Sequence, residues 1–162
     1  MTPTLGTEKP TVQDPIVKYA QEIGWAVVSP EEALSLRKGE SGAFFYRILE
    51  EKLLKLNPGL VSPENVDDII HRLEAVRNNI EGNAEILSWL RGEQAIYDEN
   101  EKRRRNVTVL DYEHPERNLF QVTAEWQYTN GRETNRADVM FLINGIPVAI
   151  VETKSAKKAN GM

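Results

Sequence analysis

Residues 136–154 contain two carboxylates and a lysine whose spacing suits metal-dependent chemistry. The segment reads RADVMFLINGIPVAIVETK, with Asp138 at the start of one apolar run and Glu152 and Lys154 at the end of the next. Two carboxylates can hold Mg²⁺ through oxygen atoms and leave positions open for water and a phosphate. A nearby lysine can orient the water and offset the charge of the transition state. These residue types predict hydrolysis of a phosphodiester bond.

A Glu-x-Lys triplet is a weak signal by itself, as a second copy in this chain illustrates. Glu50-Glu51-Lys52 lies in a predicted helix, where residues two apart do not face each other, so it indicates a solvated surface. Glu152 and Lys154 instead follow an apolar strand and project from the same face of it. Without Asp138, an exposed ion pair at a strand end explains them equally well. With Asp138 on the preceding strand, a site is favoured.

The link between the two strands sets a geometric condition on this site. A two-residue Asn144-Gly145 turn pairs Asp138 with Val151, which would turn Glu152 to the other face of the sheet. A shared metal therefore requires a register change of one residue. A three-residue turn or a bulge near Pro147 would supply it, because proline cannot donate to the ladder. We therefore expect an irregular hairpin, and a regular one would count against the site.

Apolar periodicity predicts helices first and strands afterwards. Helices are expected over 15–23 with Asp14 as N-cap, from a capping box at Ser29 and Glu32, over 44–56, from Ser62 through Val76, and over 83–90. Strands are expected at 25–28, around Val107 and Val109, and over 120–128, with 140–143 and 148–151 typical of central strands. Residues 1–10 resemble a flexible arm. The pattern predicts one α/β (α+β) domain over 1–162, mainly helical over 11–100, with a sheet over 106–154.

Composition narrows the class of protein. The 162 residues carry a net charge of −5, contain no cysteine, and include no apolar run or leader typical of a membrane or secreted protein. Disulfides and thiolate metal sites are excluded, and a reducing cytoplasm is the expected location. Residues 1–100 hold 10 Lys/Arg and 17 Asp/Glu, whereas residues 101–162 hold 10 and 8. Phosphate contacts are therefore expected in the second part, which contains Arg103–Arg105, Arg132, Arg136, Lys154, Lys157 and Lys158.

The arrangement of Asp138 and Glu152-Thr153-Lys154 resembles the motif of the PD-(D/E)xK nuclease superfamily. The flanking segments 118–122 (NLFQV), 136–138 (RAD), 143–147 (INGIP) and 152–155 (ETKS) resemble the N-terminal region of the restriction subunits of type I restriction–modification enzymes. Ala137 stands where that motif usually has proline. The resemblance covers most of the chain and implies a restriction-endonuclease-like core, with a central mixed sheet flanked by helices.

The resemblance also implies an activity and its residues. Asp138, Glu152 and the carbonyl of Thr153 would bind Mg²⁺, or Mn²⁺, and Lys154 would be the catalytic lysine; Arg136, Lys157 and Lys158 are candidates for DNA contacts. The expected reaction is endonucleolytic cleavage of double-stranded DNA by a type I site-specific deoxyribonuclease. ATP would serve a motor region that this fragment lacks, because it has no phosphate-binding GxxxxGK[ST] loop. The implied partners are DNA and the methyltransferase and specificity subunits, of which the last would set the recognised sequence.

Other interpretations remain open at this stage. The chain could be a nuclease-shaped docking module, catalytically weak, that joins the restriction subunit to its methyltransferase partner, or a structural α/β domain with an incidental motif. A further ligand from the first helix sometimes completes sites of this superfamily. Gln13, Asp14 and Glu22 are the candidates, but capping accounts for Asp14 and surface exposure for Glu22, so none is assigned. The two histidines, His71 and His114, form no predicted metal pair.

Overall fold

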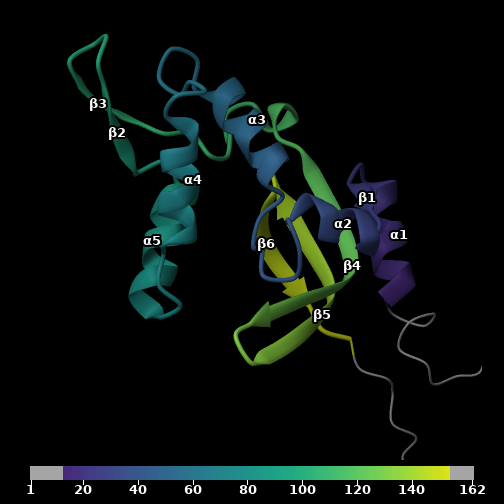
Figure 1. Cartoon of the computed structure of the whole chain (residues 1–162). Coiled ribbons are helices and arrows are strands. Elements are labelled where there is room, and N and C mark those ends of the chain that lie inside the picture. The colour runs from purple at the N-terminus through teal and green to yellow at the C-terminus, as the bar shows by residue number, and fades with distance from the viewer. Residues whose placement is uncertain (1–12, 154–162) are drawn as a thin grey trace, which may run out of the picture. The chain divides into compact units, whose positions relative to one another are not determined.

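A computed structural model describes residues 13–153, which group into two compact units. One unit contains residues 13–42, 120–142 and 147–153, and the other contains 43–119 and 143–146. The strand β5 (Glu133–Ile143) and the strand β6 (Ile146–Val151) begin or end in the second unit but run mainly in the first. Figure 1 labels the elements of both units. No helix within the described range is long and apolar enough to cross a membrane.

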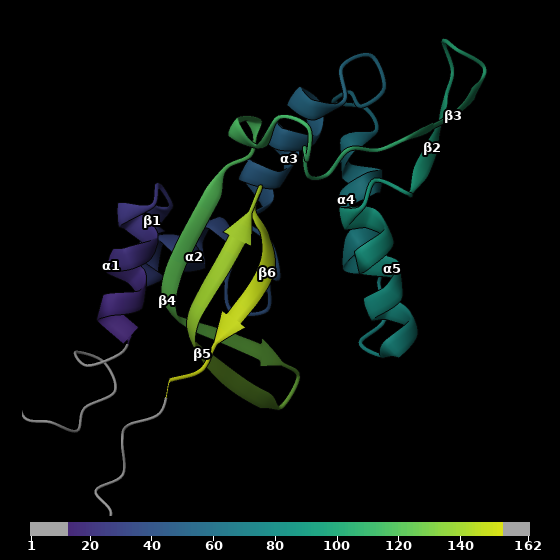
Figure 2. The same ribbon diagram turned by 180° about the vertical axis from the view of Figure 1, so that it is seen from behind.

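The first unit is built on a mixed four-stranded sheet in the order β1-β4-β5-β6. The short strand β1 (Ala26–Val28) pairs in parallel with β4 (Phe120–Asn130), with Val27 opposite Val122. Two-residue connections join β4 to β5 and β5 to β6, so these neighbours run antiparallel. In Figures 1 and 2, α1 (Asp14–Glu22) lies beside β1 and β4. The expected mixed sheet with flanking helices is therefore present.

Helix α1 packs through its apolar side on the middle of this sheet. Ala20 joins Val122 and Val139 in a buried cluster, against which Ile16 and Val17 pack. Trp25 adds edge-to-face contacts with the rings of Phe120 and Phe141, each with a centroid distance of 5.1 Å. The helix begins one residue earlier than expected. Gln13 rather than Asp14 occupies the N-cap position, and its side chain makes no capping bond.

Helix α2 (Pro30–Leu36) begins at the predicted capping box and ends at a buried arginine. The Ser29 hydroxyl accepts the Glu32 amide at 3.1 Å, which confirms Ser29 as the cap. Arg37 is only 2 % exposed, and its guanidinium carbon lies 3.8 Å from the ring centroid of Trp126 in β4. Arg37 also donates to the Gln127 carbonyl at 2.9 Å. This contact ties α2 to β4, and burial lowers the pKa of Arg37 while Glu40 opposes the shift.

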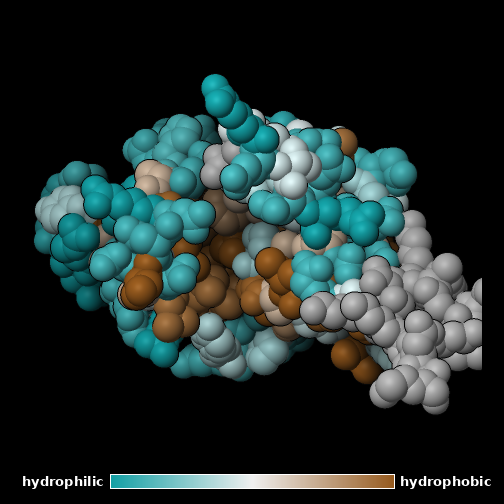
Figure 3. Space-filling model, turned by 90° about the horizontal axis from the view of Figure 1, so that it is seen from below, coloured by the Kyte–Doolittle hydropathy of each residue, from teal (hydrophilic) through white to brown (hydrophobic). Residues whose placement is uncertain are grey.

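The two apolar runs that were expected to be central strands differ in position. Strand β5 lies between β4 and β6, and its residues 137–140 are buried. Strand β6 lies at the edge of the described sheet, so the expectation of a central strand over 148–151 is wrong within the described residues. Val148 and Ile150 are exposed. Figure 3 shows hydrophobic residues, in brown, at the surface of one face of the molecule.

The second unit is mainly helical. It contains α3 (Tyr46–Leu56), α4 (Val66–Glu74), α5 (Ile80–Leu90) and a short 3-10 helix, Pro115–Arg117. The predicted stripe on α4 is confirmed, because Val66, Ile69, Ile70 and Leu73 are all buried. They share a core with Leu49 and Leu53 of α3, Trp89 of α5, and residues Val107, Val109 and Ile146. Helix α5 starts earlier than expected, at Ile80, where the Asn79 side chain accepts the Gly82 amide.

A two-stranded hairpin in this unit contains the arginine run. Strands β2 (Ala95–Asp98) and β3 (Arg103–Asn106) pair antiparallel. The prediction of a strand around Val107 and Val109 is wrong, since those residues are buried but lie outside any strand. Asp98 pairs with Arg105 at 2.7 Å, and its other oxygen accepts the Asn100 and Glu101 amides. Arg103 pairs with Glu101. The acids of the hairpin therefore pair with two of the three arginines of the run 103–105.

Candidate metal centre

The turn between β5 and β6 consists of two residues, Asn144 and Gly145. Their φ angles are 53° and 82°, so both adopt the left-handed conformation that a tight two-residue hairpin turn uses. Of the two irregularities that could change the register, the three-residue turn is therefore excluded. A side chain at position 145 is also excluded, because an added Cβ would lie 2.7 Å from the Phe45 carbonyl oxygen.

Asn144 stabilises this turn with its own side chain. It is completely buried, and its Oδ1 accepts the Leu119 amide at 2.8 Å. Its Nδ2 donates to the Val109 carbonyl at 2.9 Å and to the Asn118 Oδ1 at 2.8 Å. The left-handed backbone conformation strains asparagine less than most other residues, and these hydrogen bonds offset the remaining strain. The Asn-Gly pair thus sets where β6 begins.

The packing of Val151 bears on the register between β5 and β6. In a hairpin that stays regular from the turn, Val151 faces the same side as Asp138 and the opposite side from Val139. Val151 instead packs against the cluster that contains Val139 and Ala20. This contact alone does not set the register, because the Thr153 hydroxyl, two residues further along, bonds to the Asp138 carboxylate as a regular pairing would place it. A shared face for Asp138 and Glu152 therefore stays a prediction, and the two-residue turn counts against it.

Asp138 is held by Thr153, the residue between the two other members of the motif. The carboxylate oxygen Oδ2 of Asp138 accepts the Thr153 amide at 2.7 Å and the Thr153 hydroxyl at 2.9 Å. Both residues are buried, with 6 % of each exposed. The amide and then the hydroxyl of Thr153 lower the pKa of Asp138, and the Arg136 guanidinium adds to this effect, while burial opposes it. Asp138 is therefore a fixed carboxylate that stays ionised at neutral pH.

Of the other predicted residues, the structure describes Glu152 and Arg136. Glu152 directly follows β6 and is exposed. Arg136 lies two residues before Asp138 on β5, and its Nη2 is 3.7 Å from Oδ1 of Asp138. Arg136 is largely exposed, so this pairing is screened by solvent. Lys154, Lys157 and Lys158 lie outside the described residues.

Gln13 contacts Asp138 from the other end of the chain. Its Nε2 donates to the backbone carbonyl of Asp138 at 2.9 Å, across a separation of 125 residues. Gln13 is 4 % exposed. Sequence reasoning considered Gln13 only as a possible further ligand and assigned it no role. Glutamine before a helix carries no local signal that its partner lies in a distant strand.

The donor set at this end of β5 and β6 is limited to oxygen atoms. Asp138, Glu152 and the Thr153 carbonyl are the kinds of ligand that Mg²⁺ and Mn²⁺ prefer. Across residues 13–153 no group of three or more His, Cys, Asp or Glu side chains is placed to hold a metal. A cation bound here would therefore depend on the two carboxylates, with carbonyl and water oxygens completing its shell.

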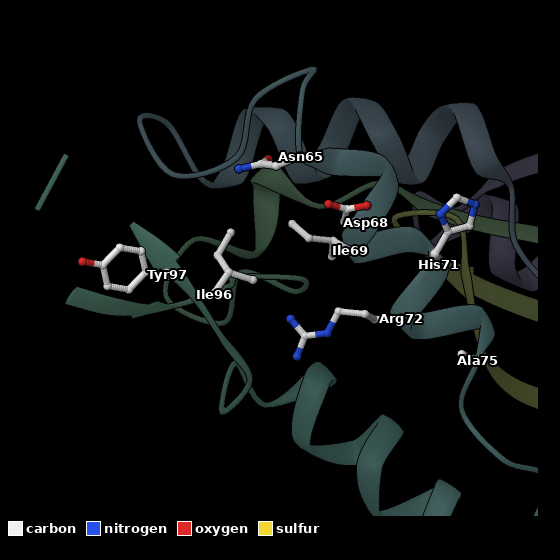
Figure 4. Close-up of a pocket in the computed structure, with 8 residues that line it drawn as sticks. All are labelled: Asn65, Asp68, Ile69, His71, Arg72, Ala75, Ile96 and Tyr97. Atoms are coloured by element: carbon white, nitrogen blue, oxygen red, sulfur yellow. The ribbon is translucent and has the colours of Figure 1, made fainter. Parts of the chain in front are cut away.

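A cavity elsewhere in the second unit does not involve these residues. It has a volume of about 630 Å³ and is lined by Ile69, Arg72 and Ala75 together with Ile96 and Tyr97 of β2 (Figure 4). Arg72 lies over the ring of Trp89, 4.9 Å from its centroid, which accounts for its position by packing. None of the predicted catalytic or metal-binding residues lines this cavity. The candidate chemistry is therefore confined to the β5–β6 end of the first unit.

A comparison with known protein families identifies the family to which this chain belongs. The family model for the N terminus of the type I restriction enzyme R protein matches residues 6–161, nearly the whole chain. The chain belongs to this R-protein family. The matched range includes every residue of the candidate centre, from Gln13 to Lys154. The predicted resemblance is thus confirmed at the level of the family.

Two relatives of this R-protein chain come from Methanocaldococcus jannaschii. One, named as the MjaIXP endonuclease subunit of a type I restriction enzyme, is 28% identical over 157 residues, which cover 90% of this chain and 15% of the relative. Another, named as the MjaVIIP endonuclease subunit of a type I restriction enzyme, is 31% identical over 67 residues, covering 41% of this chain and 6% of the relative. The chain thus matches only a small part of each relative.

Proposed function

We propose that this chain is the Mg²⁺-dependent nuclease part of an ATP-dependent type I restriction enzyme and cleaves double-stranded DNA. The observation that carries the proposal is the ionised Asp138 carboxylate, fixed by two hydrogen bonds from Thr153, in a chain of the R-protein family. The names of the relatives as endonuclease subunits support a nuclease role. The motor that uses ATP, and the methyltransferase and specificity partners, would belong to the rest of the enzyme.

Asp138 and Glu152 would hold the cation, with the Thr153 carbonyl as a further ligand. The two oxygens of Asp138 are not equivalent for this purpose. Thr153 occupies Oδ2 with two hydrogen bonds, whereas among residues 13–153 the partner of Oδ1 is the guanidinium of Arg136 at 3.7 Å. Oδ1 is therefore the atom of Asp138 suited to the metal, and Oδ2 fixes its direction. A bound Mg²⁺ supplies a Lewis acid for the phosphate and a bound water of lowered pKa.

The basic residues complete the proposed roles. Lys154, which follows Thr153, would hold or move the proton of the attacking water at Nζ and offset the developing negative charge. Arg136, Lys157 and Lys158 would contact DNA phosphates. For Arg136, a phosphate would replace the screened contact with Asp138, so its guanidinium is available at little cost.

Cleavage by the full-length subunit, assembled with its partners, tests this function. Asp138→Ala and Lys154→Ala should each lower the rate of DNA cutting by about 10²–10⁴-fold while ATP hydrolysis is retained. Asp67→Ala and Lys55→Ala, at exposed positions of α4 and α3, are matched controls that should cut normally. Undiminished cutting by the Asp138 and Lys154 variants would overturn the proposal. The chain would then be a nuclease-like docking module for the methyltransferase partner.

A further inference from the structure

The first helix and the strand that carries Asp138 are joined by two adjacent contacts of different kinds. Val139 packs against Ala20 in the apolar cluster beneath α1. One residue earlier, the carbonyl of Asp138 accepts the Gln13 side-chain amide at 2.9 Å. The apolar contact fixes how closely α1 packs on β5. The hydrogen bond fixes the backbone at the residue whose side chain faces the candidate cation.

The position of Gln13 explains why its side chain is available for this bond. Short polar residues at the N-cap usually cap their own helix through the side chain, and glutamine is not one of them. Gln13 makes no capping bond, and Pro15, in the first turn of α1, has no amide hydrogen to satisfy. Gln13 is nevertheless 4 % exposed, so its amide is buried for a contact outside the helix. Burying a glutamine costs side-chain entropy and desolvation, which a single well-placed hydrogen bond only partly offsets.

We propose that Gln13 is a positioning residue for the metal centre, acting through the backbone of Asp138 rather than as a ligand. This inference rests on the proposed function, because it assigns Asp138 to the cation. The carbonyl bond from Gln13 and the carboxylate bonds from Thr153 hold Asp138 at both ends. With the backbone and Oδ2 both fixed, Oδ1 keeps one direction before the cation arrives. Groups that orient metal ligands in this way typically contribute a factor of about 10–100 in metal affinity or activity.

Gln13→Met tests the proposal because methionine has a similar length and no donor. Gln21→Met is the matched control, since Gln21 lies exposed on the same helix. We expect Mn²⁺, titrated into the 162-residue chain by calorimetry, to bind the Gln13 variant at least about tenfold more weakly than wild type. The Gln21 variant should bind as wild type does. Thermal unfolding of each variant separates this effect from a loss of stability.

Two results would distinguish the possible failures. If Asp138→Ala abolishes Mn²⁺ binding but Gln13→Met binds Mn²⁺ as wild type does, Gln13 is a structural tie and only this inference fails. If wild type shows no Mn²⁺ binding that depends on Asp138, the proposed function fails with it. If Gln13→Met does not fold, the NMR spectrum of the wild type decides. Substoichiometric Mn²⁺ should broaden the side-chain amide resonances of Gln13 more strongly than those of Gln21, and equal broadening of both would overturn the inference.

Discussion

Replacing Thr153 with valine tests whether its hydroxyl holds Asp138 in place. Valine preserves the branched shape of threonine but cannot donate to Oδ2 of Asp138, whereas the 2.7 Å bond from the backbone amide remains. A hydrogen bond to a charged group contributes about 1.5–3 kcal/mol to stability. Because one of the two donors stays, we expect a loss of about 1.5 kcal/mol in the free energy of unfolding at pH 7.

The expected loss depends on pH in a defined direction. Thr153 lowers the pKa of Asp138 in the folded protein, so the stabilisation is complete above the ordinary aspartate pKa of about 3.9. It disappears as the pH falls through the lowered pKa, because the carboxyl group is then protonated in both the folded and the unfolded chain. The difference in stability between wild type and Thr153→Val should therefore be full at pH 7 and decrease below about pH 4.

Urea unfolding from pH 7 to pH 3 measures this difference. Thr134→Val on β5 is the matched control, because its hydroxyl bonds to Thr129 at an exposed position. The control should change stability by less than about 0.5 kcal/mol. A Thr153→Val loss that stays constant down to the lowest pH at which the chain folds would refute the reasoning, because a packing defect does not titrate. No loss at pH 7 would show that the hydroxyl bond to Asp138 contributes nothing.

Two further predictions concern the hairpins. Asn144→Ala should lower the free energy of unfolding by about 3 kcal/mol, because it removes three side-chain hydrogen bonds and strains a left-handed backbone. Asn144→Gly should lose about 1 kcal/mol less in the same urea titration, and equal losses would exclude the backbone contribution. Asp98→Asn should weaken the cross-strand NOEs between β2 and β3, because it removes the charge that pairs with Arg105. The hydrogen bond from Arg105 lowers the pKa of Asp98, so the same NOEs in wild type should persist at neutral pH and weaken as acid protonates Asp98. Unchanged NOEs in acid would contradict this prediction.

The amino-acid sequence alone determined the features that depend on neighbouring residues. The stripe on α4, the cap at Ser29 and the presence of a hairpin at Asn144-Gly145 were all predicted and are confirmed. Each depends on periodicity or on a local backbone preference, which a short window of sequence contains. The family was also predicted from short motifs, and the family model confirms it.

Local patterns were misleading where long-range pairing decides the outcome. An unbroken apolar run over 148–151 is typical of a central strand, but strand order is a property of the whole sheet, and β6 lies at the edge of its described part. The β2–β3 hairpin was missed because charged residues, Asp98 and Arg105 among them, stabilise it instead of apolar alternation. Two of the three arginines of the run therefore pair with acids of the same hairpin, and its capacity for phosphate stays a prediction.

The candidate metal centre also has features that the sequence predicted and features that only the tertiary structure shows. The spacing of Asp138, Glu152 and Lys154 along two strands is a property of the sequence, and it predicted the chemistry without any tertiary contact. The tertiary structure decided what fixes Asp138. The Thr153 hydroxyl and the Gln13 amide reach it only because the chain brings residues 15 and 125 positions away to the same strand. Such bonds form when folding closes those long loops, so no local preference of threonine or glutamine could predict them.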